Sequence, residues 1–481
     1  MAASPMRESG LQALILFGGF ILLAFLLLMK PGYLANPAFL ATIIIGQILI
    51  ASLCRYKQSF FMVLMAAFFW AGMRLPLSEA WLEGRWVVLA AGSLAGLAIY
   101  IKSRNYRFGL IHLFAFLCVL SAIVSASVSA YPQEALLKSL SLLFLFLYGT
   151  TGARLAGGGF EQKNLFSRLL VAAEGAVYVS AIAYFVLRQS IFGNPNSLGA
   201  VMGITVVPVL MWGYLGAESA VRRCRLGLAL CLAIALLMSS FSRAGVAAAL
   251  VSSFLLCITV RRYRLLIGGT LALATISVLV GAFVPPPVQN VDDPDSESIA
   301  TLFLYKGRRE EGLLGSRKGP WDATLAVIKG HPWFGSGFGT STTDLSASYF
   351  ELTRARFVDS RMVREHGNSY LAIMEWSGLL GVCPFYLLVL ATAWQARRAL
   401  VQGWRTRSIY SPAIPAAAVI VAGLIGATFE DWLFAVGYYV SVFFWAMTFM
   451  LDELMHPSAE VCPDEATVVT PDPRFATLVA S

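Results

Sequence analysis

The sequence predicts an all-α fold, a polytopic bundle of about 12–14 transmembrane helices with one large external loop domain that contains short helices. Apolar residues make up 58% of the 481 residues and charged residues only 13%, whereas soluble chains carry roughly 25% charged residues. Mean hydropathy is +0.71. Apolar runs of 16–22 residues recur, close to the ~20 that span a bilayer core. Helices suit this setting because each satisfies its own backbone hydrogen bonds in lipid.

Fourteen apolar runs are predicted to span the membrane. Their approximate bounds are 11–29, 37–54, 59–73, 86–101, 109–130, 135–153, 169–187, 198–216, 226–241, 244–260, 265–284, 369–394, 412–428 and 432–451. They divide the chain into an N-terminal bundle of about eleven spans (1–284), a large loop (285–368), C-terminal membrane helices (369–451) and a disordered cytosolic tail (452–481). The first run is interpreted as a retained helix, because Met29-Lys30-Pro31 follows it in place of a small-residue cleavage site.

Basic residues in the connections between these spans alternate in number. One set of connections holds eighteen Lys and Arg, whereas the short loops of the other set hold five, Lys30, Arg74, Arg85, Arg188 and Arg243. By the positive-inside rule the first set is cytoplasmic, and both termini are then cytoplasmic. This topology places the large loop, the turns at 193–196 and 242–245, and the turn at 430–431 on the external face.

Cysteine usage and net charge exclude several classes. None of the seven cysteines forms a CxxC pair, and the large loop contains none, so this loop is expected to lack disulfides and structural zinc. The net charge of +9 lies mainly in the short cytoplasmic loops, so it does not indicate nucleic-acid binding. No metal site is expected.

The large loop is the place where water-requiring chemistry is expected. It carries Arg317, Arg361 and Arg364, with His366 just before the chain re-enters the membrane. Residues 321–329 are predicted to form a short amphipathic helix with Trp321, Leu325 and Ile328 on one face. An arginine-rich external loop on a membrane protein suggests an enzyme that acts on a lipid-linked anionic substrate.

Several individual residues have two interpretations. Arg243 is either an arginine that reaches the interface from a helix end or a guanidinium that binds phosphate bidentately, and we favour the second. The glycines at 335, 337 and 339 resemble a phosphate-cradling loop, but a tight turn is favoured. His331 is expected to be structural. His112, Lys138 and Glu174 lie within apolar runs and are expected to support the site by pairing with each other or with backbone.

The entry to the span at 369–394 is the second candidate region. A histidine such as His366 at the start of a membrane span can act as a general base near neutral pH, or it can simply form interfacial hydrogen bonds. Asn368 and Tyr370 follow it, and Glu375 lies one to two turns further on. Glu375 could orient His366 or bind a neighbouring helix.

Together these motifs resemble the O-antigen ligase/polymerase superfamily of bacterial envelope enzymes. The resemblance covers roughly residues 190–385 and depends on the order of its motifs. These are the turn at 194–199 (NPNSLG), the turn at 242–245 (SRAG), Arg317 followed by Trp321, the run at 331–339 (HPWFGSGFG), and 368–371 (NSYL) leading through Glu375 to 378–381 (GLLG). The sequence departs once from the usual pattern, because Gly367 separates His366 from Asn368.

The resemblance implies a multi-pass glycosyltransferase of the bacterial inner (cytoplasmic) membrane whose active face is periplasmic. Such an enzyme transfers a glycan from undecaprenyl diphosphate to a hydroxyl acceptor, lipid A core for ligases, without a metal or cofactor. By position, Arg243 and Arg317 match arginines that hold the diphosphate, and His366 matches the acceptor-activating base. The expected substrate-binding residues are Asn194, Asn196, Trp321, Arg361, Arg364, Asn368 and Tyr370. The expected partners are the lipid-linked donor, a lipid or saccharide acceptor and membrane lipids.

Three alternatives stay open from the sequence. A polymerase of the same superfamily would use another lipid-linked repeat unit as acceptor. A transporter of lipid-linked sugars is less favoured, since transporters carry polar groups near the membrane midplane and repeated halves. A catalytically silent scaffold is the third. The first external loop, 30–36, contains no Asp or Glu, which disfavours a mechanism with a catalytic acid there.

Overall fold

The computed structural model describes residues 44–50, 52–53, 56–76, 78–102, 108–158, 162–265, 267–269, 271, 275, 315–341, 365–407 and 409–456. Within these residues every regular secondary-structure element is a helix, so the predicted all-α class is confirmed. The α-helices are α3 (Lys57–Ala71), α4 (Ser78–Lys102), α5 (Leu110–Ser127), α6 (Pro132–Tyr148), α7 (Arg154–Gly157), α8 (Gln162–Ala181), α9 (Pro195–Ala200), α10 (Val207–Leu215), α11 (Ala220–Ser239), α12 (Arg243–Thr259), α15 (Gly315–Gly330), α16 (Ser369–Thr406), α17 (Ala413–Gly426) and α18 (Tyr439–Met455). Short π-helical stretches at Gly149–Ala153, Ile182–Val186 and Val201–Val206 extend α6, α8 and α9.

Six stretches of helix among the described residues are long and apolar enough to cross a membrane. They are Ser78–Ile101, Leu110–Ser127, Pro132–Gly157, Asn164–Val186, Pro195–Leu215 and Ser369–Thr406, and α3, α12 and α17 are shorter apolar helices. Large apolar side chains such as Phe116, Val171 and Leu390 are exposed on these helices, as lipid contact requires. The predicted span 11–29 lies outside the described residues, so the span count of about 12–14 stays a prediction.

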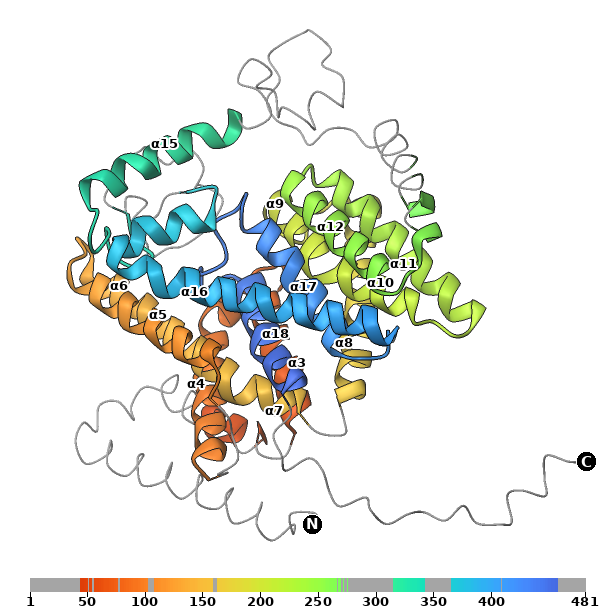
Figure 1. Ribbon diagram of the computed structural model, residues 1–481, viewed down its shortest axis with the longest axis horizontal. Helices are drawn as coiled ribbons and strands as arrows, with labels where there is room; N and C mark the ends of the chain where they lie inside the picture. The colour runs from red at the N-terminus through yellow and green to blue at the C-terminus, as the bar shows by residue number, and fades with distance from the viewer. Residues whose placement is uncertain are drawn as a thin grey trace, which may run out of the picture.

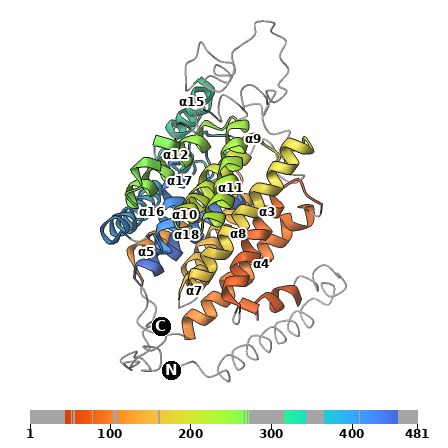
Figure 2. The same ribbon diagram turned by 90° about the vertical axis from the view of Figure 1, so that its right-hand side faces the viewer.

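Helix α18 occupies the centre of the bundle (Figures 1 and 2), and every residue from Tyr439 to Glu453 is buried. A helix that is apolar on all sides is expected in such a position. The predicted span began at 432, but the helix begins at Tyr439. The difference arises because residues 427–438 form a loop tied to α16, where the Ser369 hydroxyl donates to the Glu430 carbonyl at 2.6 Å and accepts from the Leu433 N–H at 3.1 Å.

Helix α16 runs for 38 residues but bends at Gly378, whose φ is +62°. At this bend the chain segment after α15 supplies the missing hydrogen bonds. The Leu379 N–H donates to the Pro332 carbonyl at 2.8 Å, and the Ser336 N–H donates to the Glu375 carbonyl at 2.8 Å. Because buried backbone groups must be paired, these bonds stabilise the bend and fix the segment against α16.

The glycine run that follows α15 forms the tight turn favoured from the sequence. Gly335, Gly337 and Gly339 have φ values of +77°, +115° and +71°, which favour glycine. A Cβ on Gly335 would clash with the carbonyl group of Trp376. The glycines therefore serve close backbone packing against α16.

Helix α15 lies over one end of the bundle, and α7 lies at the opposite end (Figures 1 and 2). The face of α15 that packs against the bundle differs from the predicted apolar face. Thr324 and Val327 are buried, whereas Leu325 is exposed. The buried face continues from Arg317 through Thr324, seven residues apart, which is about two helical turns. The prediction used apolar residues alone to find the packed face. The actual face includes the buried Arg317, so the predicted face was placed too far round the helix.

Candidate active site

Arg317 on α15 joins three segments of the chain. Its Nη1 lies 2.5 Å from Glu365 Oε1 and its Nη2 lies 2.5 Å from Glu430 Oε1. Burial would lower the pKa of Arg317, but the charges of Glu430 and Glu365 raise it above its usual value, so the guanidinium stays charged. One arginine thus holds the chain before α16 and the loop before α18 at the same place.

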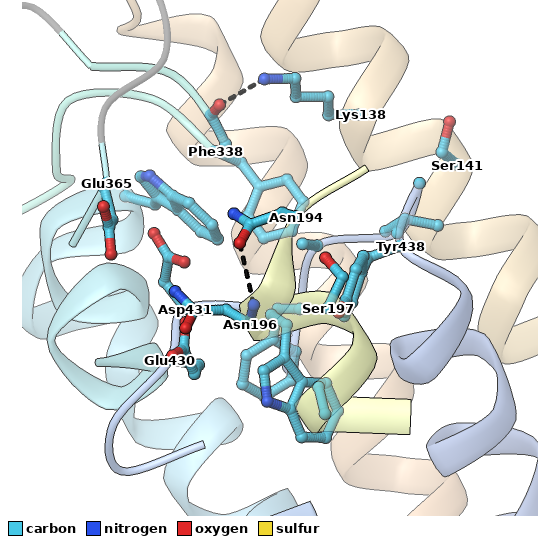
Figure 3. Close-up of a pocket in the computed structure, with 18 of the residues that line it drawn as sticks. Lys138, Ser141, Asn194, Asn196, Ser197, Phe338, Glu365, Glu430, Asp431 and Tyr438 are labelled. Carbon is cyan, nitrogen blue, oxygen red and sulfur yellow. Dashed lines mark hydrogen bonds between the residues drawn. The ribbon is translucent and has the colours of Figure 1, made fainter. Parts of the chain in front are cut away.

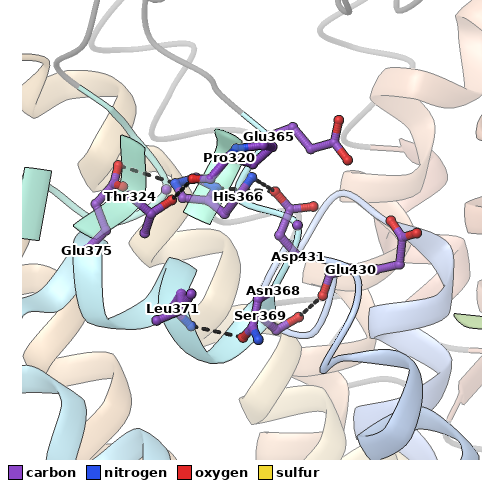
Figure 4. Close-up of polar contacts among 12 residues, drawn as sticks. Pro320, Thr324, Glu365, His366, Asn368, Ser369, Leu371, Glu375, Glu430 and Asp431 are labelled. Carbon is purple, nitrogen blue, oxygen red and sulfur yellow. Dashed lines mark hydrogen bonds and ion pairs between the residues drawn. The ribbon is translucent and has the colours of Figure 1, made fainter. Parts of the chain in front are cut away.

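His366 is the next residue after Glu365 and is 2% exposed. Its backbone N–H donates to Asp431 Oδ2 at 2.8 Å, and its Nδ1 lies 3.2 Å from the same oxygen. On the other side of the ring, Nε2 lies 3.2 Å from Glu375 Oε1. Figure 4 shows His366 between these two carboxylates. The imidazole is therefore held by two acids from different segments.

The two acids set the charge of the histidine. Burial would lower the pKa of His366, but the hydrogen bonds and charges of Asp431 and Glu375 outweigh it and raise this pKa above its ordinary value. Burial would likewise raise the pKa of Asp431, yet its bonds to His366 hold it below the usual range. The pair therefore favours the imidazolium–carboxylate form, as expected for a carboxylate–histidine pair in a poorly hydrated site.

Gly367 explains how His366 reaches Asp431 despite the extra residue before Asn368. The glycine has φ +63°, and α16 begins only at Ser369. In a helix, an added residue would turn the preceding side chain by about 100°, but His366 precedes the helix and this rotation does not apply to it. The indole Nε1–H of Trp321 donates to the Gly367 carbonyl at 3.2 Å, so Trp321 positions this turn from α15.

Arg243 begins α12, after Ser242 caps the helix by accepting from the Gly245 N–H at 3.3 Å. It is half-buried and lies within electrostatic range of Arg317 and Glu430. Close packing of Gly199, near the end of α9, and Gly245 brings α9 to the start of α12, because no Cβ fits between these glycines. Two predicted motifs, about 45 residues apart in the sequence, therefore meet at one end of the bundle.

A cavity of about 630 Å³ opens beside these groups. Figure 3 shows its carboxylates grouped on one side, with Asn194 and Asn196 in the middle and Lys138 on the other side. The lining residues are Arg85, Trp86, Lys138, Ser141, Asn194, Asn196, Ser197, Ala200, Phe338, Gly339, Glu365, Trp376, Glu430, Asp431, Trp432, Phe434, Ala435, Val436, Gly437 and Tyr438. Asp431 lines the cavity and His366 lies behind it, so the pair reaches the cavity through the carboxylate.

The predicted substrate-binding residues are divided by the structure. Asn194 and Asn196 line the cavity, although the Asn194 side chain also caps α9 by accepting from the Asn196 N–H at 2.9 Å. Asn368 caps α16 and donates to the Thr428 carbonyl at 3.0 Å. The Tyr370 hydroxyl donates to the Leu424 carbonyl at 3.0 Å. These bonds give Asn368 and Tyr370 a positioning role in the structure, and Arg361 and Arg364 lie outside the described residues.

His112, Glu174 and Lys138, which were expected to support the site, each have a different partner. His112 bonds to Arg154, with 2.9 Å between Nε2 and Nη1. Glu174 lies 2.9 Å from the Nε of Arg225. Lys138 donates to the Gly339 carbonyl at 2.5 Å and so contacts the cavity. Among the described residues no group of three or more His, Cys, Asp or Glu side chains is arranged so that it could hold a metal ion, and the expected absence of a metal stays a prediction.

Several residues of the site were not identified from the sequence. Glu365, Glu430 and Asp431 hold Arg317 and His366, yet none was a candidate. The signal was present, because Glu430 and Asp431 form an acidic pair between two apolar runs, and the predicted topology placed their turn on the external face. His331, expected to be structural, is exposed and does not line the cavity.

Residues 227–386 match a family model described as O-antigen ligase. The matched segment runs from α11 into α16 and contains Arg243, Arg317 and His366. The match confirms the predicted resemblance to the O-antigen ligase-like superfamily, and with the apolar helices it supports a membrane enzyme of the O-antigen ligase type. A search of curated proteins finds no match.

Proposed function

We propose that this O-antigen ligase-like membrane protein is a glycosyltransferase. It would transfer a glycan from undecaprenyl diphosphate to a hydroxyl of a lipid or saccharide acceptor, such as lipid A core, on the periplasmic face of the inner membrane. One observation carries the proposal: a buried His366–Asp431 pair reaches a cavity of about 630 Å³ beside Arg317, with Arg243 in electrostatic range of Arg317.

The His366–Asp431 pair is suited to take a proton from the acceptor. In the transfer, the acceptor oxygen attacks the anomeric carbon, and the bond from that carbon to the diphosphate oxygen breaks with its electron pair on the diphosphate. The hydroxyl proton passes to the His366–Asp431 pair, whose carboxylate lines the cavity. Asp431 contacts the acceptor and passes the proton to His366 when the imidazole is neutral. Because the pKa of His366 is raised, its protonated form is stabilised as the proton arrives.

The arginines are suited to the departing diphosphate. Arg317 now binds two carboxylates through separate nitrogens, and phosphate oxygens accept from the same planar fork. Donor binding would exchange at least one of these carboxylates for a phosphate oxygen. Arg243 adds a second positive charge in range of the first, and such prearranged donors stabilise the charge that develops on a leaving group.

The test is transfer from a purified lipid-linked glycan by the wild type and by Arg243→Ala and Arg317→Ala. Both variants should lose most of their activity, whereas Arg398→Ala, which removes an exposed arginine at the other end of α16, should not. Undiminished turnover in both site variants would refute the phosphate clamp.

The acceptor separates a ligase from a polymerase. Deletion in the source bacterium, followed by separation of surface glycans by size, distinguishes them. Loss of glycan attachment indicates a ligase, whereas shortened chains indicate a polymerase. Translocation of the lipid-linked sugar without any covalent product would instead favour a transporter.

A further inference from the structure

Two positive charges line the cavity on helices that take no part in the proposed chemistry. Arg85 lies seven residues after the start of α4, and Lys138 lies six residues after the start of α6. These helices pack against each other. With α5 returning between them, they run in the same direction, so both cations lie about 10 Å below the helix starts. They are therefore at a similar depth in the cavity wall.

Neither cation forms an ion pair within 4.0 Å among the described residues, where the ion pairs involve other groups. Glu134, one turn before Lys138 on α6, acts on the lysine only over a longer distance. Arg85 donates from Nη1 to the Gly437 carbonyl at 2.7 Å, and its Nε is buried without a hydrogen-bond partner. Lys138 donates to the Gly339 carbonyl. A lysine has three donors and an arginine five, so most of their capacity is unused. Poorly hydrated charges of one sign are costly unless an anion compensates them.

The rest of the wall has the chemistry of a saccharide site. The aromatic side chains of Trp86, Trp376 and Tyr438 line the cavity, and the Arg85 guanidinium lies over the Trp86 ring, 5.2 Å from its centroid. Aromatic side chains beside charged donors are typical of a surface that contacts a sugar ring. Trp432 also lines the cavity. The volume of about 630 Å³ falls within the roughly 300–1,000 Å³ of small-molecule sites.

The charges in the cavity are separated by sign. Glu365, Glu430 and Asp431 lie on one side, and Lys138 lies on the other (Figure 3). Arg317 and His366 form ion pairs with these acids, whereas Arg85 and Lys138 form no ion pair within 4.0 Å in the part of the chain that the structure describes. An anionic group is repelled from the acidic side and attracted to the basic side. The arrangement would orient a ligand that carries a negative charge at one end and a hydroxyl at the other.

We propose that the cavity binds an acidic saccharide, whose carboxylate or phosphate ester contacts Arg85 and Lys138 while the ring lies against the aromatic wall. A free hydroxyl of the same saccharide then faces Asp431. The identification of this saccharide as the acceptor rests on the proposed function. The proposed binding of an acidic saccharide depends only on the residues that line the cavity.

The experiment measures saccharide binding by saturation-transfer NMR, with the full chain in nanodiscs of neutral phosphatidylcholine and no donor present. The probes are glucose, glucuronic acid and glucose 6-phosphate, and inorganic phosphate, which has no C–H protons, is measured by its displacement of the glucose 6-phosphate signal. Both acidic sugars, or the one whose anion fits, should bind about tenfold or more tightly than glucose, as expected for charge-assisted hydrogen bonds. Comparison of the two acids identifies carboxylate or phosphate as the preferred anion.

Substitutions test whether Arg85 and Lys138 cause the preference for acidic sugars. The pair Arg85→Gln and Lys138→Gln should abolish the preference for acidic sugars, and Arg85→Lys with Lys138→Arg should retain it. The pair Arg398→Gln and Arg405→Gln, two exposed residues at the other end of α16, is the charge-matched control and should change nothing. The charge-keeping variants separate loss of the anion site from loss of folding.

Three results would overturn the proposal. Glucose could bind as tightly as the acidic sugars, the preference could persist in the double Gln variant, or inorganic phosphate could bind as tightly as glucose 6-phosphate, which would indicate an anion site without sugar recognition. The outcome is independent of turnover. A chain that transfers glycans without preferring acidic sugars contradicts only this inference, and a chain that prefers them without transferring glycans contradicts only the proposed function.

Discussion

Two buried clusters in this protein have nearly the same composition and lie at opposite ends of the bundle. At the end covered by α15, His366 is bonded to Asp431 beside Arg317. At the end that carries α7, His112 is bonded to Arg154, which pairs with Glu453 at 2.6 Å. Each cluster joins an arginine, a histidine and carboxylates from distant segments.

The clusters differ in access. The Asp431 side chain is 27% exposed and lines the cavity, whereas the side chains of Arg154 and Glu453 are 2% and 6% exposed. The sealed cluster ties α5 and α7 to α18, and its charged side chains are almost inaccessible to solvent. Composition alone therefore does not identify a catalytic site. We use contact with a cavity as the second criterion, and the following predictions test whether the two clusters differ in function.

Replacement of the two histidines should give the largest contrast. His366→Ala should lower glycan transfer by about 10²–10⁴-fold, the usual contribution of a general base. His112→Ala should leave transfer at the wild-type level and lower only the thermal stability in detergent. Exposed His331→Ala is the control for both. An equal loss of transfer in the His366 and His112 variants would mean that the sealed cluster also takes part in catalysis.

Breaking the sealed ion pair should have the largest effect on stability. Glu453→Gln leaves Arg154 buried and uncompensated, which costs roughly 3–5 kcal/mol in comparable sites. The midpoint of thermal unfolding in detergent measures it, with exposed Glu83→Gln as the control. A midpoint equal to that of the control would show that the pair contributes nothing to the fold.

The geometry of Arg317 should matter beyond its charge. Arg317→Lys keeps the charge but cannot bind two acceptors through a planar fork, so transfer should fall by about tenfold or more. Lys318→Arg, at the exposed neighbouring position, should have no effect. Full activity in the lysine variant would reduce the role of Arg317 to that of a point charge.

The smallest expected effect is a shift in the pH profile of transfer. Because Glu375 helps raise the pKa of His366, and the base must be unprotonated, the rate should rise with pH through a midpoint above the ordinary histidine value of about 6.5. Glu375→Gln removes a negative charge that stabilises the imidazolium and should move this midpoint to lower pH. A midpoint that stays fixed, or moves upward, contradicts the assignment of His366 as the titrating base.

Part of the candidate site could be predicted from the sequence because some motifs are local. Ser242 and Asn368 cap the helices that follow them, and both are typical capping residues next to apolar runs. Arg243 and His366 were found because each lies at the end of an apolar run on the predicted external face. Asp431 was missed because its importance depends on a contact with His366, 65 residues away, which no local pattern encodes.

The sequence by itself determined the all-α membrane bundle. Long apolar runs can satisfy their backbone groups in lipid only as helices, and the family resemblance followed from the order of short motifs. Only the tertiary structure decided which charges meet. The left-handed Gly367, the bend at Gly378 and the loop at 427–438 direct Asp431 and Glu375 to opposite sides of His366. The physical reason is that hydrophobicity fixes where a helix can lie, whereas charge pairing depends on the position of each side chain, which packing of distant segments sets.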